Sequence, residues 1–220
     1  MDKYLSIITN FGCHYTCPYC IVKNNNLHIP KTTVDGLREL PNAIKEHKVN
    51  WVSISGGGDP LFELWENLYW YETLFRITPN DIKLELHTSY FRHDFMYMVV
   101  CKGFDRVVYH LRDIDDISMI NRWRKDQIVR VVFVVTEDFT SEKIDSIVSA
   151  VKASDIVDEL SFRQMVDENY KTTHYCEEYL KAGHKKDWYY IEQNDYNLYY
   201  CENEVSYKYE DFKYKEEKSC

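Results

Sequence analysis

The 220-residue sequence lacks long apolar runs and a recognisable targeting segment. No stretch approaches the roughly 18–20 uncharged apolar residues that a membrane-spanning helix requires. The first four residues, Met1-Asp2-Lys3-Tyr4, also lack the basic and then apolar pattern of a signal peptide. We therefore expect a cytoplasmic protein that does not enter a membrane. Thiols stay reduced in that compartment, so clustered cysteines indicate metal or redox chemistry rather than disulfides.

The chain is also poor in glycine, proline and basic residues. It has seven glycines and five prolines, and 27 basic against 36 acidic side chains give it a net charge of −9. Sequence-independent binding of nucleic acid depends on neutralising phosphates, so this charge argues against nucleic acid as a partner but does not exclude a local basic patch that binds it. A hydrophobic content of 45% is enough for a buried core, which excludes a disordered chain and a small disulfide-stapled scaffold.

Short β-branched or apolar runs alternate with longer amphipathic segments over the first 166 residues. The runs typical of strands are Tyr4–Thr9, Trp51–Ser55, Ile82–His87, Arg106–Leu111, Ile128–Thr136 and Val157–Phe162. The first helical pattern begins with Thr33 as its cap, and others cover residues 61–75, residues 95–99, Ile114–Trp123 and Ser141–Lys152, the last with Ser141 as its cap. Phe95, Met98 and Val99 are expected to face the core, as are Ile144, Ile147, Val148 and Val151. Six such units predict an α/β fold, a partial (β/α)6 TIM-like barrel.

The last part of the chain differs in composition from the rest. Residues 167–220 contain eleven of the nineteen tyrosines and no proline. Two segments in it, at 198–202 and 205–210, alternate in the manner of a β-hairpin. We predict a core barrel over residues 1–166, and a C-terminal extension over residues 167–220 that forms a lid or hairpin and covers the substrate.

Three of the seven cysteines, Cys13, Cys17 and Cys20, lie within eight residues directly after the first predicted strand. In a parallel α/β fold this position is at the carboxyl edge of the sheet, where ligands bind. Iron–sulfur clusters take cysteine thiolate ligands at short spacings of this kind. The Cys-x3-Cys-x2-Cys segment therefore predicts a cluster that leaves one iron without a protein ligand.

The cysteine spacing and its context resemble those of the radical S-adenosylmethionine (SAM) superfamily. In that superfamily an aromatic residue precedes the last cysteine, and Tyr19 fills that place here. The resemblance implies that Cys13, Cys17 and Cys20 hold a [4Fe–4S] cluster, and that the amino and carboxylate groups of SAM chelate its open iron. It also implies that Tyr19 packs near the adenine.

A run of three glycines ends the second predicted strand, in Ser55-Gly56-Gly57-Gly58-Asp59-Pro60. Successive glycines expose backbone groups that can bind a small zwitterion, although a tight turn before a helix also explains them. The segment resembles the Gly-Gly-Glu-Pro segment of the superfamily, whose backbone binds the amino group of SAM. The matching residues are Gly57, Gly58, Asp59 and Pro60. Aspartate in place of glutamate should matter little if backbone groups bind the ligand.

The resemblance implies further cofactor contacts at the ends of the later strands. Those expected to contact SAM or line its pocket are Thr88 after the third strand, His110 and Arg112 at the fourth, Val135 at the fifth and Arg163 at the sixth. Arg112 is suited to bind a carboxylate, because arginine forms strong hydrogen bonds with that group. The structural alternatives are that His110 is a hydrogen-bonded histidine at a strand end and that Arg163 forms an ion pair on the surface.

The resemblance implies a radical enzyme. A flavodoxin or ferredoxin would reduce the cluster, and the electron would cleave SAM to a 5′-deoxyadenosyl radical that abstracts hydrogen from the substrate. The cofactor supplies this chemistry, and no catalytic residue is assigned beyond the cluster ligands. Basic clusters at Arg122–Lys125 and His184–Lys186 would suit a nucleotide or a phosphorylated metabolite, so we expect a small-molecule or nucleotide-type substrate. An activating or peptide-modifying enzyme of the same superfamily is the alternative.

Two other classes of function stay open. A zinc-binding module would need a fourth ligand beside the three cysteines, such as His14, His28 or Cys176. Cys17-Pro18-Tyr19-Cys20 also matches the redox dithiol of glutaredoxins. The remaining cysteines, Cys101, Cys176, Cys201 and Cys220, are widely separated, so no second cluster is expected and their roles are open.

Overall fold

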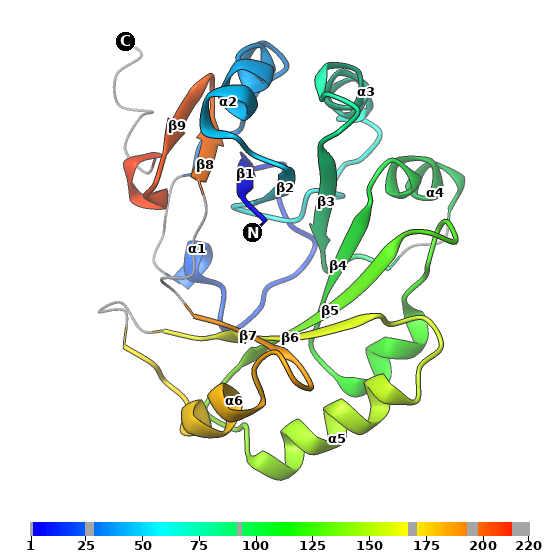
Figure 1. The fold of residues 1–220 in the computed structure, drawn as a ribbon, viewed down its shortest axis with the longest axis vertical. Helices are drawn as coiled ribbons and strands as arrows, with labels where there is room; N and C mark the ends of the chain where they lie inside the picture. Colours follow the sequence, from blue (N-terminus) through cyan, green and yellow to red (C-terminus); the bar gives the residue numbers. More distant parts are fainter. Residues whose placement is uncertain (1, 25–28, 92–93, 167–170, 193–197, 213–220) are drawn as a thin grey trace. The chain divides into compact units, whose positions relative to one another are not determined.

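The computed structural model describes residues 2–24, 29–91, 94–166, 171–192 and 198–212 (Figure 1). The chain divides into two compact units, of which the first joins residues 1–105 with 196–220 and the second covers residues 106–195. His28 and Cys220 lie outside the described residues. Within the described ranges, no helix has both the length and the apolar character that crossing a bilayer requires.

The first unit is built on three parallel strands. They are β1 (Tyr4–Thr9), β2 (Trp51–Gly56) and β3 (Lys83–Thr88), and each lies within one residue of its prediction. The central strand β2 pairs with both others. The helices of the first unit are α1 (Ile21–Asn24), α2 (Leu40–His47), α3 (Leu68–Ile77) and α4 (Phe95–Lys102), with 3₁₀ helices at Asp35–Leu37 and Tyr209–Phe212. Leu5, Ile7, Ile54, Leu74 and Leu86 are fully buried and form its core.

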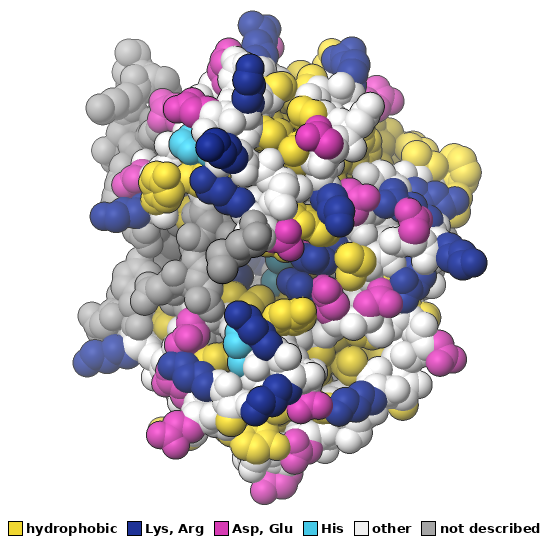
Figure 2. All heavy atoms as spheres, viewed as in Figure 1, with side chains coloured by type: hydrophobic (Ala, Val, Ile, Leu, Met, Phe, Trp, Pro, Cys, Tyr) yellow, Lys and Arg dark blue, Asp and Glu magenta, His cyan; other side chains and the backbone are white. Residues whose placement is uncertain are grey.

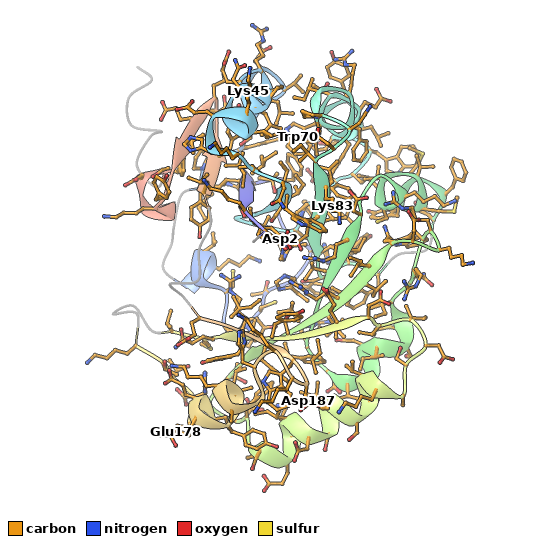
Figure 3. All side chains as sticks on the ribbon, viewed as in Figure 1. Asp2, Lys45, Trp70, Lys83, Glu178 and Asp187 are labelled. Atoms are coloured by element: carbon orange, nitrogen blue, oxygen red, sulfur yellow. The ribbon has the colours of Figure 1, made fainter. Side chains whose placement is uncertain are left out.

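The chain after the cysteine segment returns along β1. The backbone N–H and the hydroxyl of Thr32 both donate to the carbonyl oxygen of Ile8, at 3.2 and 2.8 Å. Trp70 of α3, labelled in Figure 3, donates its indole N–H to the carbonyl of Thr32 at 2.8 Å. These bonds join α3 to the segment that closes the long connection after β1.

A hairpin from the far end of the chain completes the sheet of the first unit. Strand β8 (Leu198–Cys201) pairs in parallel with β1, and β9 (Glu204–Ser206) pairs antiparallel with β8. The predicted hairpin is therefore confirmed, but it lies at the edge of β1 as part of the sheet (Figure 1). Residues 171–192 belong to the second unit. The role of residues 167–220 as a substrate cover stays a prediction.

The turn of this hairpin caps the helical segment at the start of α2. The carboxylate of Glu202 accepts hydrogen bonds from the backbone N–H and the hydroxyl of Thr33. The side chain of Asn203 accepts from the backbone N–H of Glu39 at 3.1 Å, and the backbone N–H of Asn203 donates to the carbonyl of Gly36 at 3.1 Å. Thr33 acts as the predicted cap, since its hydroxyl accepts from the N–H of Gly36.

Two helix predictions in the first unit need correction. Helix α3 begins at Leu68 rather than at residue 61, because residues 60–67 form turns in which the Asn67 amide donates to the Glu63 carbonyl. In α4 the expected core face was wrong, since Phe95 is 69% exposed and Val99 is 44% exposed. Tyr97, Val100 and Cys101 face the core instead. Asp94 caps this helix and begins it at Phe95, and the Tyr97 hydroxyl donates to the Leu61 carbonyl, which turns that face inward.

The second unit holds four parallel strands in the order β4, β5, β6 and β7. Their bounds are Arg106–Leu111, Ile128–Val135, Glu159–Gln164 and Tyr189–Ile191. Helix α5 (Ser141–Lys152) follows β5, and α6 (Glu177–Gly183) precedes β7. The expected core face of α5 is confirmed, with Thr140 rather than Ser141 as its cap. Only a 3₁₀ helix, Ile114–Met119, forms where a helix to Trp123 was predicted.

Basic side chains of the second unit stabilise its fold. The guanidinium of Arg122 donates to the carbonyls of Gln127 and Ile156 and to the carboxylate of Asp158, at 2.6 to 2.8 Å. Lys152 pairs with Asp187, which Figure 3 labels. On the face drawn in Figure 2, side chains of both signs are interspersed among the coloured residues. Arg122, which had favoured a nucleotide-type substrate, is thus engaged within the fold.

Removing the cap at Glu202 should destabilise the first unit. Glu202→Ala deletes the acceptor of two hydrogen bonds at a helix start, and loss of such a cap costs about 1 kcal/mol. Urea denaturation followed by circular dichroism measures the change in the free energy of unfolding. Glu46→Ala on the exposed side of α2 is the matched control. Equal stability of the two variants would contradict the capping role.

Stability should fall on acidification through His174. This buried ring accepts the N–H of Cys176 on Nδ1 and bonds the Tyr190 hydroxyl through Nε2, at 3.3 and 3.0 Å. Burial lowers the pKa of His174. The unfolded chain therefore binds the proton more readily, and stability is lost as the pH falls below about 6.5.

The variant His174→Gln removes this titration, so its free energy of unfolding should change less than that of the unmodified chain between pH 7 and pH 5. His47→Gln on α2 serves as the control. An identical pH dependence of the unmodified chain and His174→Gln would refute the assignment.

Candidate functional site

The two predicted motifs meet at one edge of the first unit's sheet. Thr9 at the end of β1 is in register with Gly56 at the end of β2. Beyond these residues the contact continues, because the N–H of Gly57 donates to the carbonyl of Thr9 and the N–H of Asp59 donates to the carbonyl of Gly12, both at 2.8 Å. The glycine run therefore lies directly against the start of the cysteine loop, which we define as residues 12–20.

This close approach explains why glycines are required. A Cβ atom at Gly56 would lie 2.2 Å from the carbonyl oxygen of Thr9, and one at Gly58 would lie 2.0 Å from that of Gly12. Gly56 also has a backbone φ of +150°, which residues with a side chain rarely adopt. At Gly57 the added atom would lie 3.1 Å from the side chain of Ile29. Two of the three glycines are thus needed for contact between the loops.

Asp59 is a buried carboxylate that joins the end of β2 to the end of β3. Its oxygens accept from the N–H of Leu61 at 2.9 Å, the hydroxyl of Thr88 at 2.9 Å and the N–H of Ser89 at 2.6 Å. Burial raises the pKa of Asp59, while the hydrogen bonds and the nearby His14 oppose that rise. These contacts assign the carboxylate a positioning role that the sequence did not reveal. Its predicted contact with SAM is untested.

The hydroxyl of Thr88, like the carboxylate of Asp59, is held by hydrogen bonds. Besides donating to Asp59, its hydroxyl accepts the N–H of Tyr90 at 3.0 Å. It therefore fixes the turn that follows β3, next to the glycine run. Its predicted contact with the cofactor stays a prediction.

The cysteine loop carries three free thiols. Cys13, Cys17 and Cys20 are each partly buried, and the N–H of Cys20 donates to the carbonyl of Cys17 at 3.1 Å and closes a turn. Tyr19 lies partly buried in that turn. Burial raises the pKa of Cys13, and the negative charges of Asp59 and Cys17 act in the same direction.

The thiols are not gathered into a metal site. Across the part of the chain that the structure describes, no three side chains of His, Cys, Asp or Glu are grouped closely enough to hold a metal ion. The donor set itself suits an iron–sulfur cluster, since three reduced, partly accessible cysteines share one short loop. Binding would require their sulfur atoms to converge.

Two residues of this region have contacts that sequence reasoning did not predict, since His14 was considered only as a fourth zinc ligand and Lys23 was not considered at all. The ring of His14 contacts those of Tyr15 and Tyr90, both with centroids 4.2 Å apart, and so joins the cysteine loop to the turn after β3. Lys23 of α1 donates to the carbonyl of Tyr15 at 2.5 Å and to the hydroxyl of Thr16 at 3.3 Å. Lys23 follows Cys20 by three residues, and this closeness in the sequence could have indicated a contact with the cysteine loop.

The remaining predicted contacts lie in the second unit, at or near the carboxyl ends of its strands. Val135 is fully buried at the end of β5. Arg163 of β6 is half-buried between Val134 and Ile191 in register, and His110 of β4 is half-buried opposite Val132. Arg112 is exposed, and its backbone N–H donates to Asp116. The structure brings these residues to one edge of their own unit, and their contact with SAM is untested.

The other described cysteines lie in packed interiors. Cys101 is buried in α4, and burial raises the pKa of its thiol. Cys176 donates its thiol to the carbonyl of Phe139 at 3.1 Å. Cys201 of β8 packs with Ile8, Ile29 and Phe212. Each of these three cysteines therefore contributes to the packing of the fold.

Comparison with known proteins identifies the fold. No family model matches the sequence, and no curated protein matches it. A crystal structure of SuiB from Streptococcus suis bound to S-adenosylmethionine is similar, with a TM-score of 0.58 and 16% identity over 88% of this chain and 48% of that one. A second SuiB structure gives a TM-score of 0.61 and 14% identity over 86% and 49%.

This chain spans about half the length of SuiB. At such low sequence identity the likeness shows a shared fold. The α/β fold class expected from the sequence, a partial barrel of parallel strands with a C-terminal hairpin, is confirmed.

Replacing Asp59 should loosen the contact between the loops and destabilise the chain. Asp59→Asn keeps one acceptor oxygen and turns an N–H group toward one of the two backbone N–H donors, and leaving a buried donor unsatisfied costs about 1–3 kcal/mol. Urea denaturation of the metal-free chain measures this loss. Asp81→Asn, at an exposed position before β3, is the control. If both variants unfold at the same urea concentration, Asp59 does not hold the loops.

Proposed function

We propose that this chain is a radical SAM enzyme that binds a [4Fe–4S] cluster on Cys13, Cys17 and Cys20. The observation that carries the proposal is the hydrogen bond from the N–H of Asp59, directly after the glycine run, to the carbonyl of Gly12 at the start of the cysteine loop. The chain also shares the fold of a protein crystallised with SAM. Two motifs typical of one cofactor pair thus lie side by side in a matching fold.

The residues present fit both cofactors. Three free, partly accessible thiols on one loop suit the cluster. Gly57 and Gly58 offer backbone groups for the methionine part of SAM, and Tyr19 offers a ring for the adenine. Asp59 holds the glycine segment through its contacts with Leu61 and Ser89. Further proposed SAM contacts are Thr88, His110, Arg112, Val135 and Arg163.

Cys13, Cys17 and Cys20 would hold the cluster, which would supply the electron for reductive cleavage of SAM and so the radical chemistry that removes hydrogen from a substrate. The chain's own residues orient the cofactors and limit the access of water. We propose a flavodoxin or ferredoxin as electron donor in the cytoplasm and a small-molecule or nucleotide-type substrate. Residues 167–220 are proposed to contact that substrate. An activating or peptide-modifying enzyme remains the alternative within this chemistry.

Anaerobic reconstitution with iron and sulfide tests the proposal. The unmodified chain should turn brown, take up about four irons per chain, and release 5′-deoxyadenosine when SAM and dithionite are added. Cys17→Ala should lose the cluster, because the two remaining thiolates are too few ligands to hold it. Cys101→Ala removes a thiol buried in α4 and should retain it.

Two outcomes would contradict the proposal. Stoichiometric zinc in place of iron would support a zinc-binding module. Disulfide reduction without metal that depends on Cys17 would support a dithiol oxidoreductase.

A further inference from the structure

We propose that Lys23 is a positioning residue that holds the cysteine loop in shape and places a fixed positive charge beside the cluster site. This inference rests on the proposed function. It concerns a side chain outside the Cys-x3-Cys-x2-Cys segment, on the short helix α1 that begins directly after Cys20.

The geometry makes Lys23 a bridge across the cysteine loop. Its ammonium group lies 2.5 Å from the carbonyl oxygen of Tyr15 and 3.3 Å from the hydroxyl of Thr16. Both acceptors lie between Cys13 and Cys17, whereas the lysine follows Cys20. One side chain therefore links the segment after the third cysteine to the segment between the first two.

The start of the loop is held from the other side. The carbonyl of Gly12 accepts the N–H of Asp59, and the ring of His14 packs on that of Tyr90. The turn from Cys17 to Cys20 is closed by its own hydrogen bond. Lys23 holds Tyr15 and Thr16, which lie between these two segments, so its removal should make convergence of the three sulfur atoms entropically more costly.

The charge of Lys23 opposes the negative charge that the site collects. Its ammonium group lies on the carbonyl of Tyr15, which is two residues from both Cys13 and Cys17. Asp59 is held at the start of the same loop, so its carboxylate and the thiolates of the loop repel one another. Three thiolates on one cluster would increase this repulsion. A nearby cation also favours the more negative, reduced state of a cluster, because net charge and hydrogen bonds set its reduction potential.

Substitutions of Lys23 in the full chain separate these two effects. Lys23→Met removes both the bridge and the charge, Lys23→Gln keeps a hydrogen-bond donor without charge, and Lys23→Arg keeps both. Lys45→Met, on α2 and labelled in Figure 3, is the matched control because Lys45 is an equally exposed lysine of the same unit. Each variant is reconstituted anaerobically with iron and sulfide.

Two measurements give the result without any assay of turnover. Iron bound per chain should fall at least twofold in Lys23→Met and remain near the unmodified level in Lys23→Arg. The midpoint potential, from a redox titration followed by electron paramagnetic resonance, should fall in both neutral variants. A tenfold change in the reduction equilibrium corresponds to about 59 mV for one electron, and we expect a shift up to that size.

The outcomes distinguish this inference from the proposed function. An unmodified chain that binds iron, together with Lys23→Met equal to Lys45→Met in iron content and potential, would overturn the role of Lys23 alone. An unmodified chain that takes up no iron would overturn the proposed function and this inference with it. A potential shift shared by Lys23→Met and Lys23→Gln but absent from Lys23→Arg would establish the effect of the charge.

Discussion

The contact between the backbones of two loops is the constraint on which the candidate site depends. Gly57 and Asp59 donate their N–H groups to Thr9 and Gly12, which extends the pairing of β1 and β2 beyond the strands. Glycine is required because a Cβ atom at Gly58 would lie 2.0 Å from the Gly12 carbonyl oxygen. A cysteine motif and a glycine motif that are 40 residues apart in the sequence thereby become one site.

Polar side chains then hold this contact in place. Asp59 binds the N–H groups of Leu61 and Ser89 and so joins the end of β2 to the turn after β3. A buried carboxylate is tolerated here because hydrogen bonds satisfy its oxygens. Lys23 binds the cysteine loop through the carbonyl of Tyr15. The same residues that shape the proposed cofactor site also stabilise the first unit.

Much of the fold could be predicted because its strands are continuous apolar runs. Tyr4–Thr9 and Arg106–Leu111 form strands with the predicted bounds, as expected for parallel strands buried on both faces. The face of α4 was mispredicted because Phe95 and Val99 are as apolar as the residues that pack inward. Periodicity cannot choose between two apolar faces, and the cap at Asp94 together with the Tyr97 contact decides which is buried.

The sequence by itself determined the cysteine motif, the glycine run and the position of each after a strand, because these depend on residue type and spacing along the chain. Only the tertiary structure revealed that Asp59 is a buried tie between strands, that Lys23 bridges the cysteine loop, and that Glu202 caps a helical segment starting near Thr33. Glu202 and Thr33 are 169 residues apart. The contacts of Glu202 and Asp59 follow from strand pairing in space, and no local pattern of residues encodes them, whereas the Lys23 bridge depends on how the cysteine loop folds.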